Sequence, residues 1–400
     1  MSTNLNQASH EWATRPADQR FWDLNEMQTA TAFHRSTATE RTVDFSTVRL
    51  DSPITDDSIL FVDDSEDAPI RRSRIGHYAF GQLCRTFEAP ASYLRSLPAS
   101  LAVDCLENGR RRWVQDSSNT TRQLLYQGTS DRESTLRAAT SESYVRVWNT
   151  EIVQRLQGLA SEGWVVPSAR PVGAITSRDR IATEADVIDY GKESALTVKV
   201  GDMITPSGLY ASDHDMFAFM IHPDVVINDN QSPHGLRRGT MIRQSEVGDC
   251  AIWKLDFLFN TVCGNHIVWD ASQIKETRVR HIGKGVQENW QAMVKSISTY
   301  AQGSANEQES KIREAQELIL GNSRDEVLDL LFGKRIVTKK DAGRAYDLAE
   351  EFEAVHGNPR SMWGMVQGIT RLSQQTAYAD SRARLDFAAG KMLAGAISLN

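Results

Sequence analysis

Apolar side chains along this 400-residue chain follow one period up to about residue 285 and another beyond it. Before residue 285, polar and apolar residues mostly alternate, as in half-buried strands, and the alternation is densest between Leu136 and Trp269. Beyond it, apolar residues recur every three or four positions, which is the spacing of an amphipathic helix. This second pattern predicts helices at 286–301, 305–320, 324–332, 340–355 and 360–375.

The two patterns together predict an α+β fold with a mixed, mainly antiparallel sheet core, packed helices and a C-terminal helical region. Strands are expected at 42–50, 113–126, 136–148, 208–222, 236–244 and 266–269, and helices within 75–108 and at 150–163. Asn108-Gly109 is expected to end the helix before it as a C-cap does. The segment Val247 to Thr261 fits either state, and we favour a helix with Ser245 as its N-cap.

The same patterns predict three parts. Residues 1–70 form an N-terminal arm and an acidic loop, 71–284 an α/β core, and 285–400 the helical C-terminal region. The acidic loop contains Asp56, Asp57, Asp63, Asp64, Glu66 and Asp67.

The composition limits which binding partners and which cellular compartment are expected. The net charge of −7 and the pI of about 5.8 exclude a polycation, so nucleic-acid binding would need a local basic patch. Four cysteines are too few for a disulfide framework, and the first twenty residues are polar, so we expect a reducing compartment, the cytoplasm. No apolar run approaches the roughly 20 residues that span a bilayer, so no membrane partner is expected.

Candidate metal ligands and nucleophiles lack a complete motif. In an extended segment Asp213 and Asp215 face one side and His214 the other, so a turn explains this trio better than a metal site. Cys263 and His266 have the spacing of half a zinc site, and the other half is missing. Neither a nucleophile elbow nor a phosphate loop occurs. We therefore assign no catalytic residue, metal ligand or cofactor.

Basic and aromatic residues flank the 245–269 segment and stand out in an acidic chain. In the expected strand at 136–148, Tyr144, Arg146 and Trp148 share one face. Positive charge along a groove with aromatic planes for bases is typical of single-strand binding surfaces. The alternatives are an aromatic core stripe from which Arg146 reaches solvent, and solvated strand edges. The predicted nucleic-acid-binding residues are Arg137, Tyr144, Arg146, Trp148, Arg237, Arg238, Arg243, Arg278, Arg280 and Lys284.

Several motifs, taken in their order along the chain, resemble those of a known protein family. They are the run from Trp12 to Leu24, FGQLCRTFEAPASYLRSLP, LRAATSESYVRVWN, GLYASDHDMFAFMIHP, RQSEVGDCAIWKLDFLFNTVCGNHIVW and RVRHIG. Together they resemble the phage- and plasmid-type family labelled domain of unknown function nine hundred and thirty-two, over nearly the whole chain. The resemblance implies carriage on a phage, plasmid or related element. It gives the polar positions of these motifs no agreed catalytic role.

These observations predict a non-enzymatic protein that binds single-stranded nucleic acid, DNA in preference, and forms homo-oligomers. Strand annealing in phage recombination or replication is the process we expect, by analogy of genetic context and architecture. One alternative is a metal-dependent nuclease or hydrolase that uses Asp213, Asp215 and Glu246. Another is a phage structural protein or a protein that blocks host defence.

Overall fold

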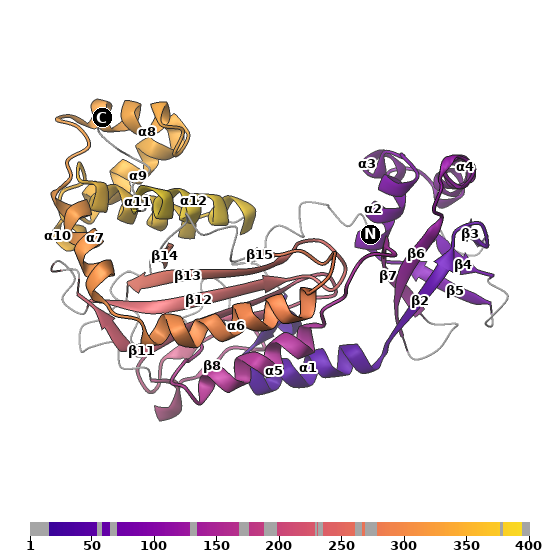
Figure 1. The fold of residues 1–400 in the computed structure, drawn as a ribbon, viewed down its shortest axis with the longest axis horizontal. Helices are drawn as coiled ribbons and strands as arrows, with labels where there is room; N and C mark the ends of the chain where they lie inside the picture. Colours follow the sequence, from indigo (N-terminus) through magenta and orange to yellow (C-terminus); the bar gives the residue numbers. More distant parts are fainter. Residues whose placement is uncertain are drawn as a thin grey trace.

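The computed structural model shows two sheets and a cluster of C-terminal helices, arranged along an elongated molecule (Figure 1). It describes residues 16–53, 58–64, 70–128, 134–167, 176–187, 198–228, 230, 235–260, 266–268, 278–376 and 379–393. Most of the predicted acidic loop (Asp56, Asp57, Glu66, Asp67), Trp12 and Cys263 lie outside these residues.

A seven-stranded antiparallel sheet forms the centre of the molecule. Its order is β1-β10-β11-β12-β13-β14, and β15 pairs with the start of β13. The strands are β1 (Arg20–Phe21), β10 (Leu209–Ala211), β11 (Met216–Ile227), β12 (Leu236–Gln244), β13 (Ile252–Asn260), β14 (His266–Val268) and β15 (Arg278–Val279). The long strands β12 and β13 leave no room for a side chain at Gly239, since a Cβ there would lie 2.1 Å from the Phe257 ring.

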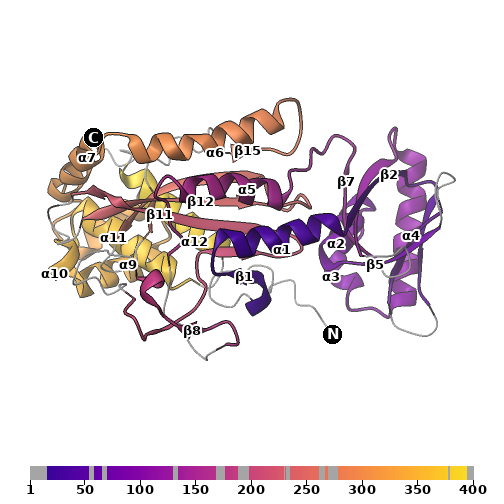
Figure 2. The same cartoon turned by 90° about the horizontal axis from the view of Figure 1, so that it is seen from below.

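Three helices lie side by side across one face of this sheet (Figure 2). They are α1 (Leu24–Ser36), α5 (Asn149–Ala160) and α6 (Val286–Gln302). Each has an apolar stripe at helical spacing, and the three stripes share one hydrophobic core with Met216, Ala218 and Met220 of β11. We call this sheet with its three helices the central lobe.

A six-stranded sheet of order β2-β6-β7-β5-β4-β3 forms the N-terminal lobe. Its strands are β2 (Ala38–Asp44), β3 (Val48–Asp51), β4 (Leu60–Asp63), β5 (Arg71–Ile75), β6 (Thr121–Gln127) and β7 (Ser134–Ser141), and β5 and β7 run parallel. Helices α2 (His77–Thr86), α3 (Ala91–Leu94) and α4 (Ala99–Asp116) pack on it around a core that includes Phe45, Phe61 and Phe87. A small two-stranded sheet joins β8 (Arg180–Ile181) to β9 (Met203–Ile204).

The C-terminal helices pack around their own core and against the ends of the central strands. They are α7 (Asn306–Glu317), α8 (Arg324–Gly333), α9 (Lys339–Glu351), α10 (Glu353–His356), α11 (Met362–Gln374) and α12 (Ala379–Lys391). Their core includes Trp363 of α11 and receives Ile227, Leu236 and Leu258 from the sheet. The α+β prediction with a helical C-terminal region is therefore confirmed. Within the described residues, no helix combines the length and the apolar character needed to span a membrane.

Two of the predicted boundaries separate parts of the chain that pack together in the structure. The boundary after residue 70 lies between β4 and β5, two paired strands of one sheet. The boundary after residue 284 lies just before α6, whose Val286, Trp290 and Ile297 pack in the core of the central lobe.

Local predictions failed where two patterns compete. Residues 252–260 form strand β13, and the favoured helix over Val247 to Thr261 is wrong. Cross-strand pairing with β12 and β15 selects the strand, in which Trp253 and Leu255 face one side and Lys254 and Asp256 the other.

Helix α4 does not end at Asn108-Gly109 but continues to Asp116. Gly109 serves close packing, because a Cβ there would lie 2.8 Å from the Phe87 carbonyl oxygen. The expected strand at 113–126 therefore begins only at Thr121, with β6.

The expected strands at 42–50 and 136–148 are shorter than predicted. The first is interrupted between β2 and β3 by a turn in which the Thr47 amide donates to the Asp44 carbonyl oxygen. The second ends with β7 at Ser141, so Arg146 and Trp148 lie in the connection to α5.

Candidate nucleic-acid interface

Predicted binding residue Arg137 lies in a buried junction between the two lobes. Its guanidinium donates to the Glu246 carboxylate (Nη2–Oε2 3.0 Å) and to the Asp213 carbonyl oxygen (Nε–O 3.0 Å). The other oxygen of Glu246 accepts from the Asn149 amide at the start of α5 (2.8 Å). Both partners of the Arg137–Glu246 ion pair have side chains at most 4% exposed. We call this set the Glu246 junction, and it joins β7, α5 and the loop after β12.

The aromatic and arginine face predicted at 144–148 is also internal. Tyr144 and Trp148 are 8% and 4% exposed, and the Tyr144 hydroxyl donates to the Ser245 carbonyl oxygen (3.0 Å). Arg146 pairs with Glu40 (Nε–Oε1 2.5 Å) and donates to the Glu246 carbonyl oxygen. These groups hold the lobes together and are not arranged as a stacking surface.

The three arginines of β12 also make contacts within the protein. Arg237 and Arg238 are 7% and 1% exposed. The Arg238 guanidinium donates to four carbonyl oxygens just at and beyond the end of α6, those of Tyr300, Ala301, Gly303 and Ser304. Arg243 lies over the Phe217 ring and is 3.6 Å from the Asp249 carboxylate. In this structure the Arg237 and Arg238 side chains are too buried for a phosphate on the surface to reach them, and their role in nucleic-acid binding stays a prediction.

The carboxylates of the nuclease alternative do not converge into a metal site. Asp215 accepts from the Ser212 hydroxyl at 2.5 Å, and Glu246 is engaged as described above. Among the residues that the structure describes, no group of three His, Cys, Asp or Glu side chains could hold a metal ion. Asp213, His214 and Asp215 occupy the turn between β10 and β11, as the sequence predicted.

His214 in this turn acts as a charged group of the fold. Burial lowers the pKa of His214, but the hydrogen bond with Asp213 and the charges of Asp215, Asp213 and Asp249 outweigh burial and raise the pKa to about 9. The Nδ1 atom lies 3.1 Å from the Asp213 carboxylate, and the ring stacks beside Tyr78 of α2. Protonated His214 therefore links the turn of the central lobe to the N-terminal lobe.

This linkage predicts a pH dependence of stability. A pKa raised from 6.5 in the unfolded chain to about 9 gives stability that is fully present below pH 6.5 and is lost as the pH rises through 9. Chemical denaturation should show that the free energy of unfolding falls as the pH is raised from 6.5 to 8.5. The slope should correspond to about one proton released on unfolding. The substitution His214→Asn should flatten this slope, and an equal slope in the variant would contradict the role of His214. Burial lowers the pKa values of His34 and His77, so their contribution to the pH dependence of stability has the opposite sign to that of His214.

The remaining predicted cations, Arg278, Arg280 and Lys284, are exposed and line one cleft. The cleft has a volume of about 760 Å³ and lies between β13, β15 and α6. Its helical wall is made by residues at helical spacing, among them Asn289, Ser296 and Thr299, which offer hydrogen-bonding groups. In the described part of the chain neither Arg280 nor Lys284 forms an ion pair.

The floor of the cleft carries a buried charge pair on β13. The Lys254 ammonium lies 2.5 Å from the Asp256 carboxylate, which also accepts from the Thr240 hydroxyl (3.1 Å). Burial raises the pKa of Asp256, while Lys254 and the Thr240 hydroxyl act in the opposite direction. The sequence prediction missed this pair because it assigned a helix to Val247–Thr261. An alternating strand pattern would have placed Lys254 and Asp256 on one face.

Arg278 borders the cleft, but its guanidinium lies over an aromatic ring on the face of β13 opposite to Lys254 and Asp256. Its guanidinium carbon lies 4.9 Å from the centre of the Trp253 ring, within the range of cation–π attraction. Arg278 and Trp253 are direct partners in the β13–β15 ladder. The sequence predicted a helix around Trp253 and assigned no element to Arg278, and the β13–β15 ladder brings the two residues together.

Comparison with protein-family models, curated proteins and solved structures finds no match for this chain. The resemblance of its motifs to the phage- and plasmid-type family stays an expectation.

Proposed function

We propose that the protein binds single-stranded nucleic acid, DNA in preference, in the cleft between β13, β15 and α6. The observation that supports this proposal is the exposure of Arg280 and Lys284 at one cleft, where neither has a carboxylate partner among the described residues, in a chain of net charge −7. Cations that keep their charge uncompensated attract phosphates, and the affinity then depends on salt through counterion release.

The shape of the cleft suits an extended strand. It follows α6, whose 17 residues measure about 25 Å, so that several nucleotides would fit along the helix. Asn289, Ser296 and Thr299 offer donors and acceptors along this path, and the exposed Ile282 offers an apolar contact at the rim. None of these groups selects a particular base, so the proposed binding is independent of sequence.

In this proposal the protein works in the cytoplasm as a homo-oligomer and assists the annealing of complementary strands. Binding by adjacent copies would hold one strand extended for pairing with another. Annealing of two labelled complementary oligonucleotides, followed by energy transfer, tests this step separately from binding.

Neutralising Arg280 and Lys284 together, as Arg280→Gln with Lys284→Gln, is expected to weaken binding of a labelled oligothymidylate. The loss of two phosphate contacts should reduce the slope of log affinity against log salt by about 1.4. Fluorescence anisotropy at several salt concentrations measures both quantities. Since both residues are exposed, the variant should keep the wild-type unfolding midpoint.

The matched control is Arg111→Gln with Arg112→Gln, which removes the same charge from the exposed side of α4 in the other lobe. This control should bind like the wild type. Equal binding by both double variants, or no binding by the wild-type protein at low salt, would refute the proposed interface.

A further inference from the structure

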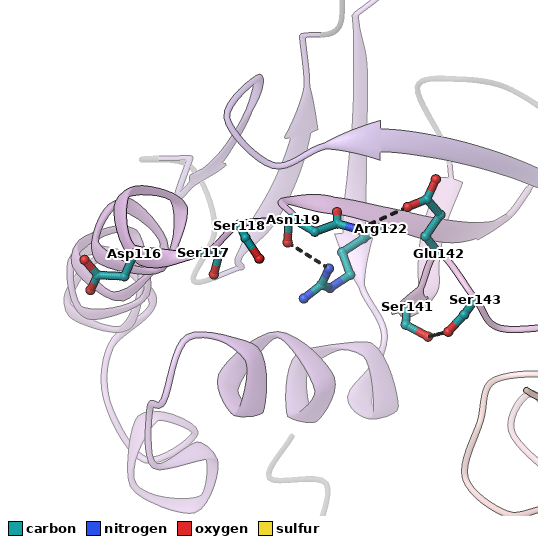
Figure 3. Close-up of a pocket in the computed structure, with 8 residues that line it drawn as sticks. All are labelled: Asp116, Ser117, Ser118, Asn119, Arg122, Ser141, Glu142 and Ser143. Atoms are coloured by element: carbon teal, nitrogen blue, oxygen red, sulfur yellow. Dashed lines mark hydrogen bonds between the residues drawn. The ribbon is translucent and has the colours of Figure 1, made fainter.

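A second hollow lies in the N-terminal lobe, where the end of α4 meets the strands β6 and β7 (Figure 3). Its volume is about 650 Å³, within the range of small-molecule sites. The loop after α4 contributes Ser117, Ser118 and Asn119, and the end of β7 contributes Ser141, Glu142 and Ser143. Neither stretch belongs to the cleft along α6.

Internal hydrogen bonds hold the two sides of this hollow in place. The Asn119 side-chain amide donates to the Glu142 carboxylate (Nδ2–Oε2 3.1 Å), and the Gln123 amide donates to the Glu142 carbonyl oxygen (2.8 Å). The hydroxyls of Ser141 and Ser143 lie 3.1 Å apart. The hollow is therefore formed before any ligand arrives, which limits the entropy that binding loses.

Arg122 presents its guanidinium to this hollow from β6. It is the direct cross-strand partner of Ser141, so both side chains lie on the same face of the sheet. Its Nη1 atom donates to the Thr121 carbonyl oxygen at 2.7 Å, and the Trp113 ring supports the group at 4.4 Å. Within the described part of the chain neither Nε nor Nη2 of Arg122 has a protein acceptor, so these donors are available to a ligand.

The charges of the lining decide which chemistry fits. Figure 3 shows the Asp116 carboxylate pointing away from Arg122, so the charged groups of the hollow are the Arg122 guanidinium and the Glu142 carboxylate, whose charges cancel and offer a phosphate dianion no net attraction. The guanidinium disfavours a metal ion. A neutral ligand with many hydroxyls matches the mixture, since a hydroxyl donates to carboxylates and accepts from a guanidinium or an amide.

We propose that this hollow binds a sugar through a vicinal diol, with Arg122 donating to the diol oxygens and Glu142 accepting from a diol hydroxyl. The serine hydroxyls and Asn119 would contact the rest of the ring. A planar guanidinium and a planar carboxylate each span two neighbouring hydroxyls, which makes the pair selective for a diol over a single hydroxyl.

Two sources of a diol are distinguished by the ligands used. Adenosine carries the ribose 2′,3′-diol, 2′-deoxyadenosine lacks it, and methyl glucoside is a free sugar with several diols. Saturation-transfer NMR on the full chain is expected to detect adenosine, methyl glucoside or both, and to detect 2′-deoxyadenosine at least about tenfold more weakly than adenosine when ribose is the source. Absence of signal from both diol ligands, or equal binding of adenosine and its 2′-deoxy form without any methyl glucoside binding, would overturn the proposal.

Two variants link the binding to this hollow. Glu142→Gln removes the charged acceptor from an exposed position, and Arg122→Ala removes the donor, so each should weaken diol binding about tenfold. Arg72→Ala, an exposed arginine of the same lobe outside the lining, should bind like the wild type. Unchanged diol binding by Glu142→Gln, or binding of inorganic phosphate that Arg122→Ala abolishes, would show that the hollow is not a diol site.

Discussion

Replacing Glu246 with Gln is expected to lower the free energy of unfolding by about 3 to 5 kcal/mol, because it leaves the buried Arg137 guanidinium without its counter-charge. The ion pair is 3.0 Å long and its two side chains are 4% and 3% exposed. Water cannot replace the lost carboxylate at such burial. Glu246 also accepts from the Asn149 amide at 2.8 Å, so the change weakens the start of α5 as well. Chemical denaturation followed by circular dichroism measures the loss.

Glu307→Gln is the matched control, since Glu307 pairs with Lys311 on the exposed surface of α7 and should leave the unfolding midpoint unchanged. Replacing both buried partners, as Arg137→Met with Glu246→Leu, should recover part of the lost stability because no charge is then left buried. If Glu246→Gln and Glu307→Gln behaved alike, the Glu246 junction would have no role in joining the two lobes.

The second large effect is expected at Arg238. Arg238→Met should cost about 3 to 5 kcal/mol, since the guanidinium satisfies several buried carbonyl oxygens at once. Burial lowers the pKa of Arg238, and the group is 1% exposed. It donates to the Tyr300 and Gly303 carbonyl oxygens, both at 2.7 Å, where α6 ends. These carbonyl oxygens lie at the negative end of the helix dipole, which a cation stabilises.

Arg238→Lys should be nearly as destabilising, because an ammonium cannot reproduce the planar fork that reaches both α6 and the Gln308 side chain. Arg155→Met removes an exposed arginine from α5 and serves as the control. Thermal and chemical unfolding of the three variants show whether the loss of stability is specific to Arg238. A midpoint for Arg238→Met within the error of the control would contradict the capping role.

These two predictions concern the surroundings of Arg137 and Arg238, two arginines that the sequence placed in a binding surface. The residues next to an arginine in the sequence do not show whether its side chain will be buried or exposed. Arg137 and Glu246 are separated by 109 positions, and Arg238 and Gln308 by 70. Only the folded chain shows that acceptors from these distant segments surround each guanidinium.

Local signals were sufficient for the C-terminal helices and for α5. Their apolar residues recur at helical spacing, and neighbours within four positions decide helix formation. The sequence also located β11 and β12, although both strands are buried on both faces over most of their length and show no alternation of burial there. The segment 252–260 failed because its apolar residues satisfy both periods, and pairing with β12 and β15 selected the strand.

The sequence by itself determined the fold class, the change to helices in the C-terminal part and the basic character of Arg278, Arg280 and Lys284. Tertiary structure decided which cations remain exposed, that Lys254 and Asp256 line the same cleft, and that Arg122 lies directly opposite Ser141 on the neighbouring strand. The physical reason is the range of the interactions. Periodicity depends on neighbours along the chain, whereas burial and charge pairing depend on segments that meet only when the sheets have formed.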